Sequence, residues 1–101
     1  MIFIYTTCQK VEEAENLSKL IINKKLAANV DFWPIRSCRT RKNDVTIIEK
    51  FMIVISTFEK KLEDLTFIIS ESHKYSVPMI AGVDVRRINF DYKEWMSSQI
   101  E

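Results

Sequence analysis

The order of strand-like and helix-like stretches constrains this 101-residue chain more than any other feature, because one order occurs twice. Four stretches are rich in β-branched and aromatic side chains and predict strands at residues 1–7, 28–39, 45–57 and 79–85. Two stretches repeat apolar side chains with helical spacing, at residues 11–25 and 58–73, and a short helix is expected at residues 89–98. This order predicts an α+β, ferredoxin-like βαββαβ sandwich with an antiparallel sheet, as a single domain over residues 1–101.

Local signals predict where these strands and helices lie and end. Right-handed crossovers put the first and third expected strands at the centre of the sheet. Pro34 cannot donate to a strand ladder, so the second strand is expected at an edge or with a bulge. The polar residues 39–44 predict the tip of a long hairpin. Ser56 and Glu59 fit a capping box for the second helix, and Pro78 follows its expected end.

The third expected strand is apolar at every position of residues 51–55. Successive side chains of a strand point to opposite sides of the sheet, whereas both helices cover only one side. An exposed apolar face usually marks a protein interface, so we predict a homo-oligomer with Phe51, Ile53 and Val54 among the interface residues. The alternative is that the terminal helix folds over the open face.

The bulk composition limits the classes of partner. Lys and Arg total 15 and Asp and Glu total 14, which argues against general binding of nucleic acid. No apolar run approaches the roughly 20 residues of a membrane-spanning helix. Cys8 and Cys38 have no CxxC spacing, which favours reduced thiols. With no secretory signal recognised, we expect a soluble, cytoplasmic protein.

Three short strings occur in an order that fits this architecture. They are Lys-Leu-Ala-Ala at residues 25–28, His-Lys-Tyr-Ser-Val-Pro at residues 73–78 and Asp-Tyr-Lys-Glu-Trp at residues 91–95. Together they resemble the CutA family of divalent-cation tolerance proteins, over nearly the whole chain. The resemblance implies a ferredoxin-like subunit in a tight homotrimer whose sheets pack around the threefold axis. It also implies a role in divalent metal ion tolerance or response, with copper binding in bacterial members and no established catalytic reaction.

The sequence departs from the family pattern at two places: the hairpin tip, and the position directly after Pro78. Residues 39–44 lack the aromatic and Trp-x-Gly usual at this tip, and Met79 stands where members often have a carboxylate. The aromatic residues Tyr75, Tyr92 and Trp95 are expected to pack the C-terminal segment against the subunit interface.

A soft metal site is the first functional candidate. Cys8 follows the first expected strand, His73 matches the family histidine, and Met79 replaces the acidic residue. Thiolate, imidazole and thioether suit Cu(I), so copper or another metal ion is the expected ligand. The alternatives are structural: His73 caps the end of a helix, and Cys8 is a small buried hydrophobe.

Other functions have less support in the sequence. A trimeric small-molecule sensor or interaction scaffold, similar to nitrogen-regulatory PII proteins, would use clefts between subunits near His73, Tyr75, Trp95 and the hairpin arginines. Gly82 is the only glycine, so there is no glycine-rich phosphate loop, and no nucleophile motif surrounds the histidine. We therefore expect no catalytic residues. The third strand also lacks the aromatic spacing of an RNA-binding sheet.

Overall fold

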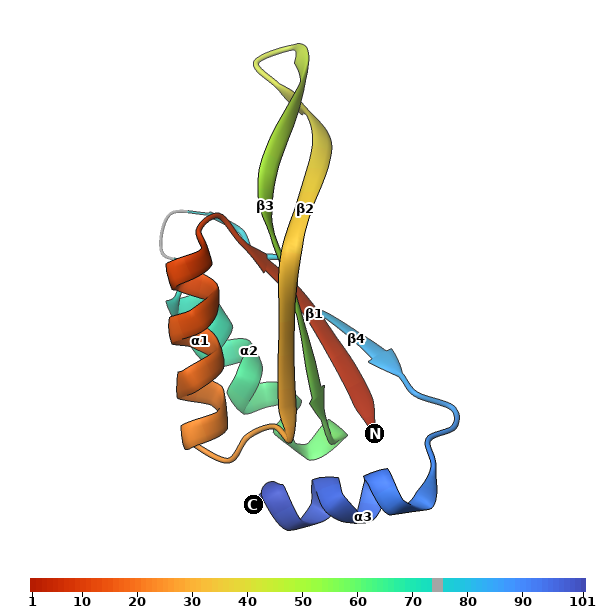
Figure 1. The fold of residues 1–101 in the computed structure, drawn as a ribbon. Helices are drawn as coiled ribbons and strands as arrows, with labels where there is room; N and C mark the ends of the chain where they lie inside the picture. The colour runs from red at the N-terminus through yellow and green to blue at the C-terminus, as the bar shows by residue number, and fades with distance from the viewer. Residues whose placement is uncertain (74–75) are drawn as a thin grey trace.

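Four antiparallel strands form one sheet in the computed structural model, which describes residues 1–73 and 76–101. The strands are β1 (Ile2–Cys8), β2 (Asn29–Arg41), β3 (Asp44–Thr57) and β4 (Ala81–Asp84). Their order is β2-β3-β1-β4, so β1 and β3 are central, as predicted (Figure 1). Pro34 lies on β2, which is an edge strand as predicted, and it is in register with Phe51 of β3.

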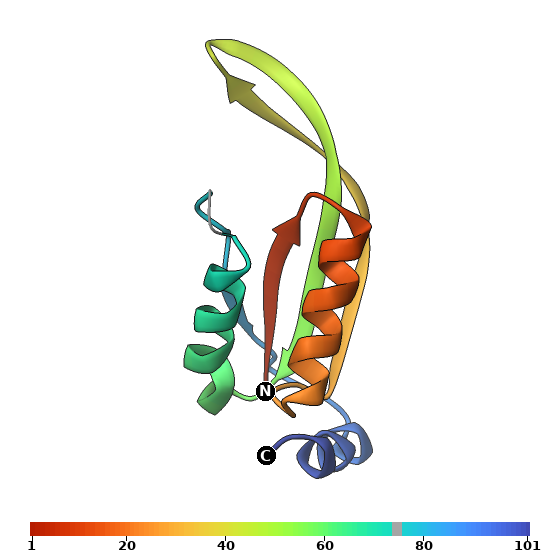
Figure 2. The same cartoon turned by 90° about the vertical axis from the view of Figure 1, so that its left-hand side faces the viewer.

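Both long helices lie on the same side of the sheet (Figure 2). They are α1 (Val11–Asn23) and α2 (Leu62–Glu71), and a 3₁₀ turn, η1 (Glu59–Lys61), precedes α2. The core between them and the sheet is made of fully buried aliphatic residues, including Ile4, Ile21, Ile53, Ile55, Leu65 and Ile69. The predicted α+β, ferredoxin-like fold is therefore confirmed.

The predicted capping box at the second helix is wrong. Ser56 is still part of β3, where its carbonyl accepts a hydrogen bond from the N–H of Ala28 at 3.0 Å. Its backbone is therefore committed to the strand, and α2 begins only at Leu62. A carboxylate does cap the other helix: Glu13 Oε1 accepts a hydrogen bond from the N–H of Lys10 at 3.0 Å, before the first residue of α1.

The β2–β3 hairpin is longer and its tip shorter than the sequence suggested. The strands pair as far as Arg41 with Asp44, which leaves a two-residue turn. Lys42 and Asn43 have φ of 50° and 69°, and two successive positive φ values are typical of a type I′ turn, whose twist matches that of the strands. The hairpin projects well beyond the helices (Figure 1).

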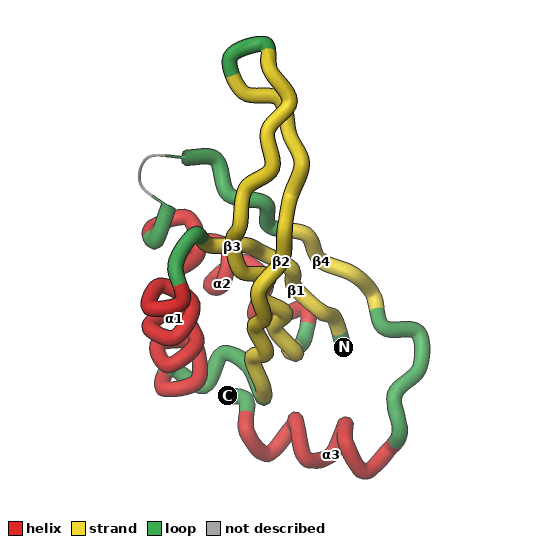
Figure 3. The backbone as a smooth tube through the Cα atoms, turned by 45° about the horizontal axis from the view of Figure 1, so that its top comes forward, coloured by secondary structure: helices red, strands yellow, loops and turns green. Residues whose placement is uncertain are grey.

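The terminal helix α3 (Phe90–Gln99) lies past the ends of the strands and does not cover the open face of the sheet (Figures 1 and 3). The chain end is held there by the N–H of Glu101, which donates to the carbonyl of Lys25 at 3.2 Å. Met96 of this helix is fully buried. The alternative in which the terminal helix closes the open face is therefore wrong.

The structure separates the apolar residues of β3 by face. Ile53 is 0% exposed in the subunit core and has no surface to offer to a neighbour. Val54 points to the open face, where it pairs with Tyr5 of β1. On the same face, Trp33 is 42% exposed and Val83 is 47% exposed.

Within the described residues, no helix has the length and apolarity needed to cross a membrane.

Candidate functional site

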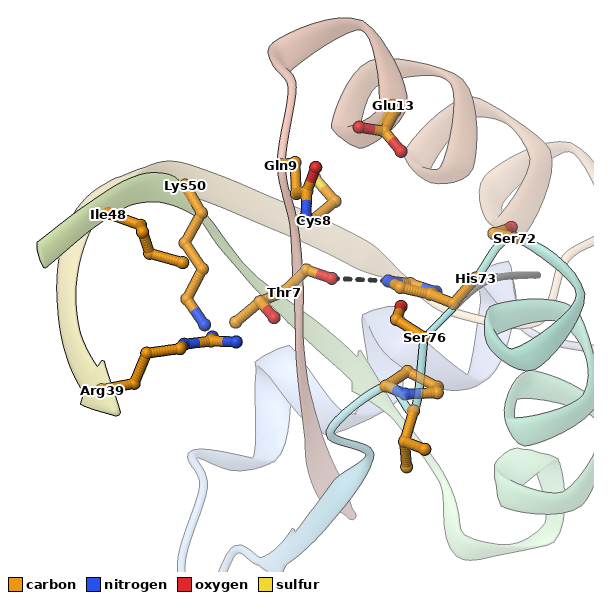
Figure 4. A pocket seen from close by; sticks show the side chains of 12 residues that line it. Thr7, Cys8, Gln9, Glu13, Arg39, Ile48, Lys50, Ser72, His73 and Ser76 are labelled. Atoms are coloured by element: carbon orange, nitrogen blue, oxygen red, sulfur yellow. Dashed lines mark hydrogen bonds between the residues drawn. The ribbon is translucent and has the colours of Figure 1, made fainter. Parts of the chain in front are cut away.

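A pocket of about 300 Å³ lies where β1 ends, between the hairpin and the end of α2 (Figure 4). Polar and charged side chains make up most of its wall: Thr7, Gln9, Glu13, Arg39, Lys50, Ser72, His73 and Ser76. Cys8, Ile48, Val77 and Pro78 complete it. Cys8 and His73, which are 65 positions apart in the chain, are therefore brought to one site.

His73 is held at both ring nitrogens by backbone carbonyl groups. Its Nδ1 lies 2.7 Å from the carbonyl oxygen of Ile69, in the last turn of α2. Its Nε2 lies 2.7 Å from the carbonyl oxygen of Thr7 (Figure 4). A neutral imidazole has one N–H, so only the doubly protonated ring donates to both oxygens. In this arrangement His73 joins α2 to β1, and neither nitrogen is free to bind a metal ion.

Cys8 is a protonated, buried thiol. Its Sγ donates to the carbonyl oxygen of Lys10 at 3.4 Å. Burial, with a smaller contribution from the Glu13 carboxylate, raises the pKa of Cys8 to about 11. A metal ion would have to displace the thiol proton, because the thiolate is the ligand form. The second cysteine, Cys38, is exposed on β2.

The predicted third ligand does not join the other two. Met79 is 44% exposed and is not among the residues that line the pocket. Within the described part of the chain, no group of three or more His, Cys, Asp or Glu side chains is placed to hold a metal ion. The structure thus provides two soft donors and no third ligand from the predicted set.

Two cations on the hairpin form the other wall of the pocket. Arg39 comes from β2 and Lys50 from β3, on the same side of the hairpin as Ile48 (Figure 4). Burial, and secondarily the nearby Arg39 guanidinium, lower the pKa of Lys50 below its ordinary value. From the sequence, Arg39 is expected at the hairpin tip, and Lys50 is not among the expected site residues. Lys50 immediately precedes the apolar run of β3, and this was the available signal that it lies near the body of the domain.

The predicted interface residues are distributed over the molecule. Phe51 is half-buried against the core, and Val54 is half-buried on the open face. Tyr92 and Trp95 of α3 are in contact, with ring centroids 5.4 Å apart and the ring planes tilted by 48°. This helix lies at the end of the sheet opposite the hairpin (Figure 1). Tyr75 lies outside the described residues, and the interface assignments remain predictions.

Comparison with known proteins identifies relatives along the whole chain. The family model described as CutA1 divalent ion tolerance protein matches residues 2–99. The divalent-cation tolerance protein CutA of Pyrococcus horikoshii is 30% identical, over 95% of this chain and 94% of that protein. A solved structure of the periplasmic divalent cation tolerance protein CutA from Archaeoglobus fulgidus superposes with a TM-score of 0.92. It is 28% identical and covers 100% of both chains.

These relatives correct the predicted localisation. Besides the periplasmic protein of Archaeoglobus fulgidus, the chain is 29% identical to the chloroplastic protein CutA of Arabidopsis thaliana. That match covers 96% of this chain and 54% of the plant protein. The cytoplasmic prediction is therefore wrong. Two unpaired cysteines and a net charge of +1 are compatible with each of these compartments, so the composition of the domain does not determine where it resides.

Proposed function

From the premise that this chain belongs to the CutA1 divalent ion tolerance protein family, we propose that it acts in metal-ion tolerance as a copper-binding homotrimer without catalytic activity. The observation that carries the copper proposal is the meeting of Cys8 and His73 in one pocket. The family and its named relatives are described by tolerance to divalent cations and not by a reaction.

The donor chemistry favours copper in its soft, monovalent form. A thiolate and an imidazole suit Cu(I), whereas a hard divalent ion would require carboxylate or carbonyl ligands. Binding would require Cys8 to lose its proton and His73 to release the carbonyl group of Thr7 or Ile69. Uptake of copper should therefore release protons and strengthen as the pH rises towards the pKa of Cys8.

A copper titration tests this proposal. Under anaerobic conditions, Cu(I) supplied from a chromogenic chelator should transfer to the wild-type protein at one ion per chain. Cys8→Ser and His73→Gln should each abolish this transfer. The matched control is Cys38→Ser, which removes the exposed thiol and should leave the stoichiometry unchanged. Loss of uptake in Cys38→Ser alone, or no stoichiometric uptake by the wild type, would contradict the proposal.

The homotrimer is supported by the open face of the sheet. The exposed side chains of Trp33 and Val83 flank the half-buried pair of Tyr5 and Val54, and no helix or strand in the described parts of the chain covers them. Identical subunits commonly bury such faces in closed symmetric assemblies. Light scattering should give three times the 11.9 kDa mass of one chain.

A trimeric small-molecule sensor is the second candidate function. It is favoured by Arg39 and Lys50, because two cations in the wall of a pocket oppose the entry of a metal cation and attract an anion.

A further inference from the structure

Arg39 and Lys50 lie close together at one end of the pocket without a compensating carboxylate. Their charged ends lie side by side and point towards Thr7 (Figure 4). In residues 1–73 and 76–101, neither side chain has a carboxylate oxygen within 4.0 Å. The ion pair found among the described residues joins Lys25 to Glu101, and it lies at the opposite end of the sheet from the pocket.

The acidic side chain in the pocket wall does not neutralise these cations. Glu13 lies across the pocket, beyond Cys8 (Figure 4). Its Oε1 is engaged with the backbone N–H of Lys10 at 3.0 Å. Two like charges that share a partly desolvated wall repel each other, and a bound anion would offset this repulsion. The charge distribution therefore favours an anionic ligand at the hairpin end of the pocket.

The remaining lining provides neutral hydrogen-bonding groups. Thr7 lies between the cations and His73 in Figure 4, and Ser76 lines the same pocket. Hydroxyl groups donate to phosphate oxygens, and a guanidinium group binds such oxygens with two parallel hydrogen bonds. The volume of about 300 Å³ is at the lower end of the range for small-molecule sites, so the pocket has room for more than a bare anion.

We propose that this pocket binds the phosphate group of a small phosphorylated molecule, with Arg39 and Lys50 as the anchoring cations. A phosphate monoester carries close to two negative charges at pH 7, which matches the cation pair better than the single charge of a carboxylate. This inference goes beyond the copper proposal. It involves different side chains, and copper uptake and phosphate binding can fail separately.

The test is calorimetric titration with glycerol 3-phosphate, inorganic phosphate and succinate at constant ionic strength. Glycerol 3-phosphate should bind saturably to the wild type, and Arg39→Gln and Lys50→Gln should each weaken it at least tenfold. The matched control, Arg41→Gln, removes the same charge from β2 two residues further along and outside the pocket, and should leave the affinity unchanged. Tighter binding of the ester than of inorganic phosphate identifies a phosphorylated metabolite as the ligand, and equal binding identifies free phosphate.

A second measurement does not depend on the variants. Amide NMR signals of Thr7, Ile48 and Ser76 in the wild type should shift on addition of the ester, while those of α3 should not. No saturable binding, tighter binding of succinate, or equal weakening by all three substitutions would overturn the proposal. The last result would mean that only the net charge of the hairpin matters, and a carboxylate of a neighbouring subunit would then be the natural partner of this pair.

Discussion

The two faces of the sheet have similar apolar side chains but different surroundings. On the covered face, Ile4, Ile53 and Ile55 are fully buried under α1 and α2. On the open face, Val54 is only half-buried, and Trp33 is 42% exposed. The difference teaches that apolar character does not by itself identify the core of this subunit. One face closes within the chain, and the other requires a partner if it is to be shielded from water.

The largest expected effect comes from a charge on the covered face. Ile53→Asp should prevent folding, because an unpaired buried carboxylate costs several kcal/mol, a large part of the roughly 5–15 kcal/mol that stabilises a typical domain. Far-UV circular dichroism and soluble yield measure this loss. Ile53→Val is the control and should cost only about 1 kcal/mol. A soluble Ile53→Asp protein with a wild-type melting curve would contradict the assignment of this face as the core.

The same substitution one residue along should have a different result. Val54→Asp puts a carboxylate on the open face, so the subunit should remain folded while the assembly dissociates to 11.9 kDa particles. Light scattering and circular dichroism together separate these outcomes. Val54→Thr, which is similar in shape and uncharged, should retain most of the assembly. If Val54→Asp leaves the native mass unchanged, the open face is not a contact between subunits.

Substitutions of two buried threonines on the covered face should have smaller effects on stability, and the two effects should be opposite in sign. Thr57 Oγ1 donates to the carbonyl oxygen of Leu26 at 2.6 Å, so Thr57→Val should cost about 1–3 kcal/mol. Thr6 Oγ1 is buried without a hydrogen-bond partner in the described residues, so Thr6→Val should stabilise the protein by about 1 kcal/mol. Urea denaturation at one protein concentration measures both. Equal effects of the two substitutions would mean that the Thr57 hydrogen bond makes no net contribution.

The effect that is smallest at neutral pH is a pH dependence at Cys8, which is confined to alkaline conditions. Its pKa of about 11 exceeds the ordinary value of 9.0, so the folded state holds the thiol proton more tightly than the unfolded state. This contribution to stability is complete below pH 9 and is lost as the pH rises to about 11. Melting temperatures should therefore fall more steeply over this interval in the wild type than in Cys8→Ala. Parallel pH profiles for the two proteins would be inconsistent with a buried, protonated thiol.

Much of the fold could be predicted because it depends on local patterns. The repeated order of strands and helices predicts the βαββαβ topology, and the missing N–H of Pro34 predicts an edge strand or a bulge, of which the edge position is observed. The strings that resemble the CutA family also identify the correct family. The position of α2 was predicted less accurately, because pairing of β3 through Thr57 overrides the local preference of Ser56 for a cap.

The site was only partly predictable because its members depend on packing between distant segments. The sequence suggests Cys8 and His73 as ligands but contains no sign that both imidazole nitrogens contact carbonyl groups of Thr7 and Ile69. It also does not indicate that Lys50 and Arg39 line the same wall of the pocket, because this depends on the orientation of the hairpin relative to the end of β1.

The sequence by itself determined the order of the elements, the edge position of β2 and the excess of apolar residues in the central strands. The tertiary structure alone decided which of those residues are covered. Side chains alternate along β3, so a shift of one residue in register would exchange Ile53 with Val54 between the two faces. Five consecutive apolar residues carry no alternation from which the buried set can be recognised. Only the packing of α1 and α2 against one side distinguishes the core from the surface that remains open.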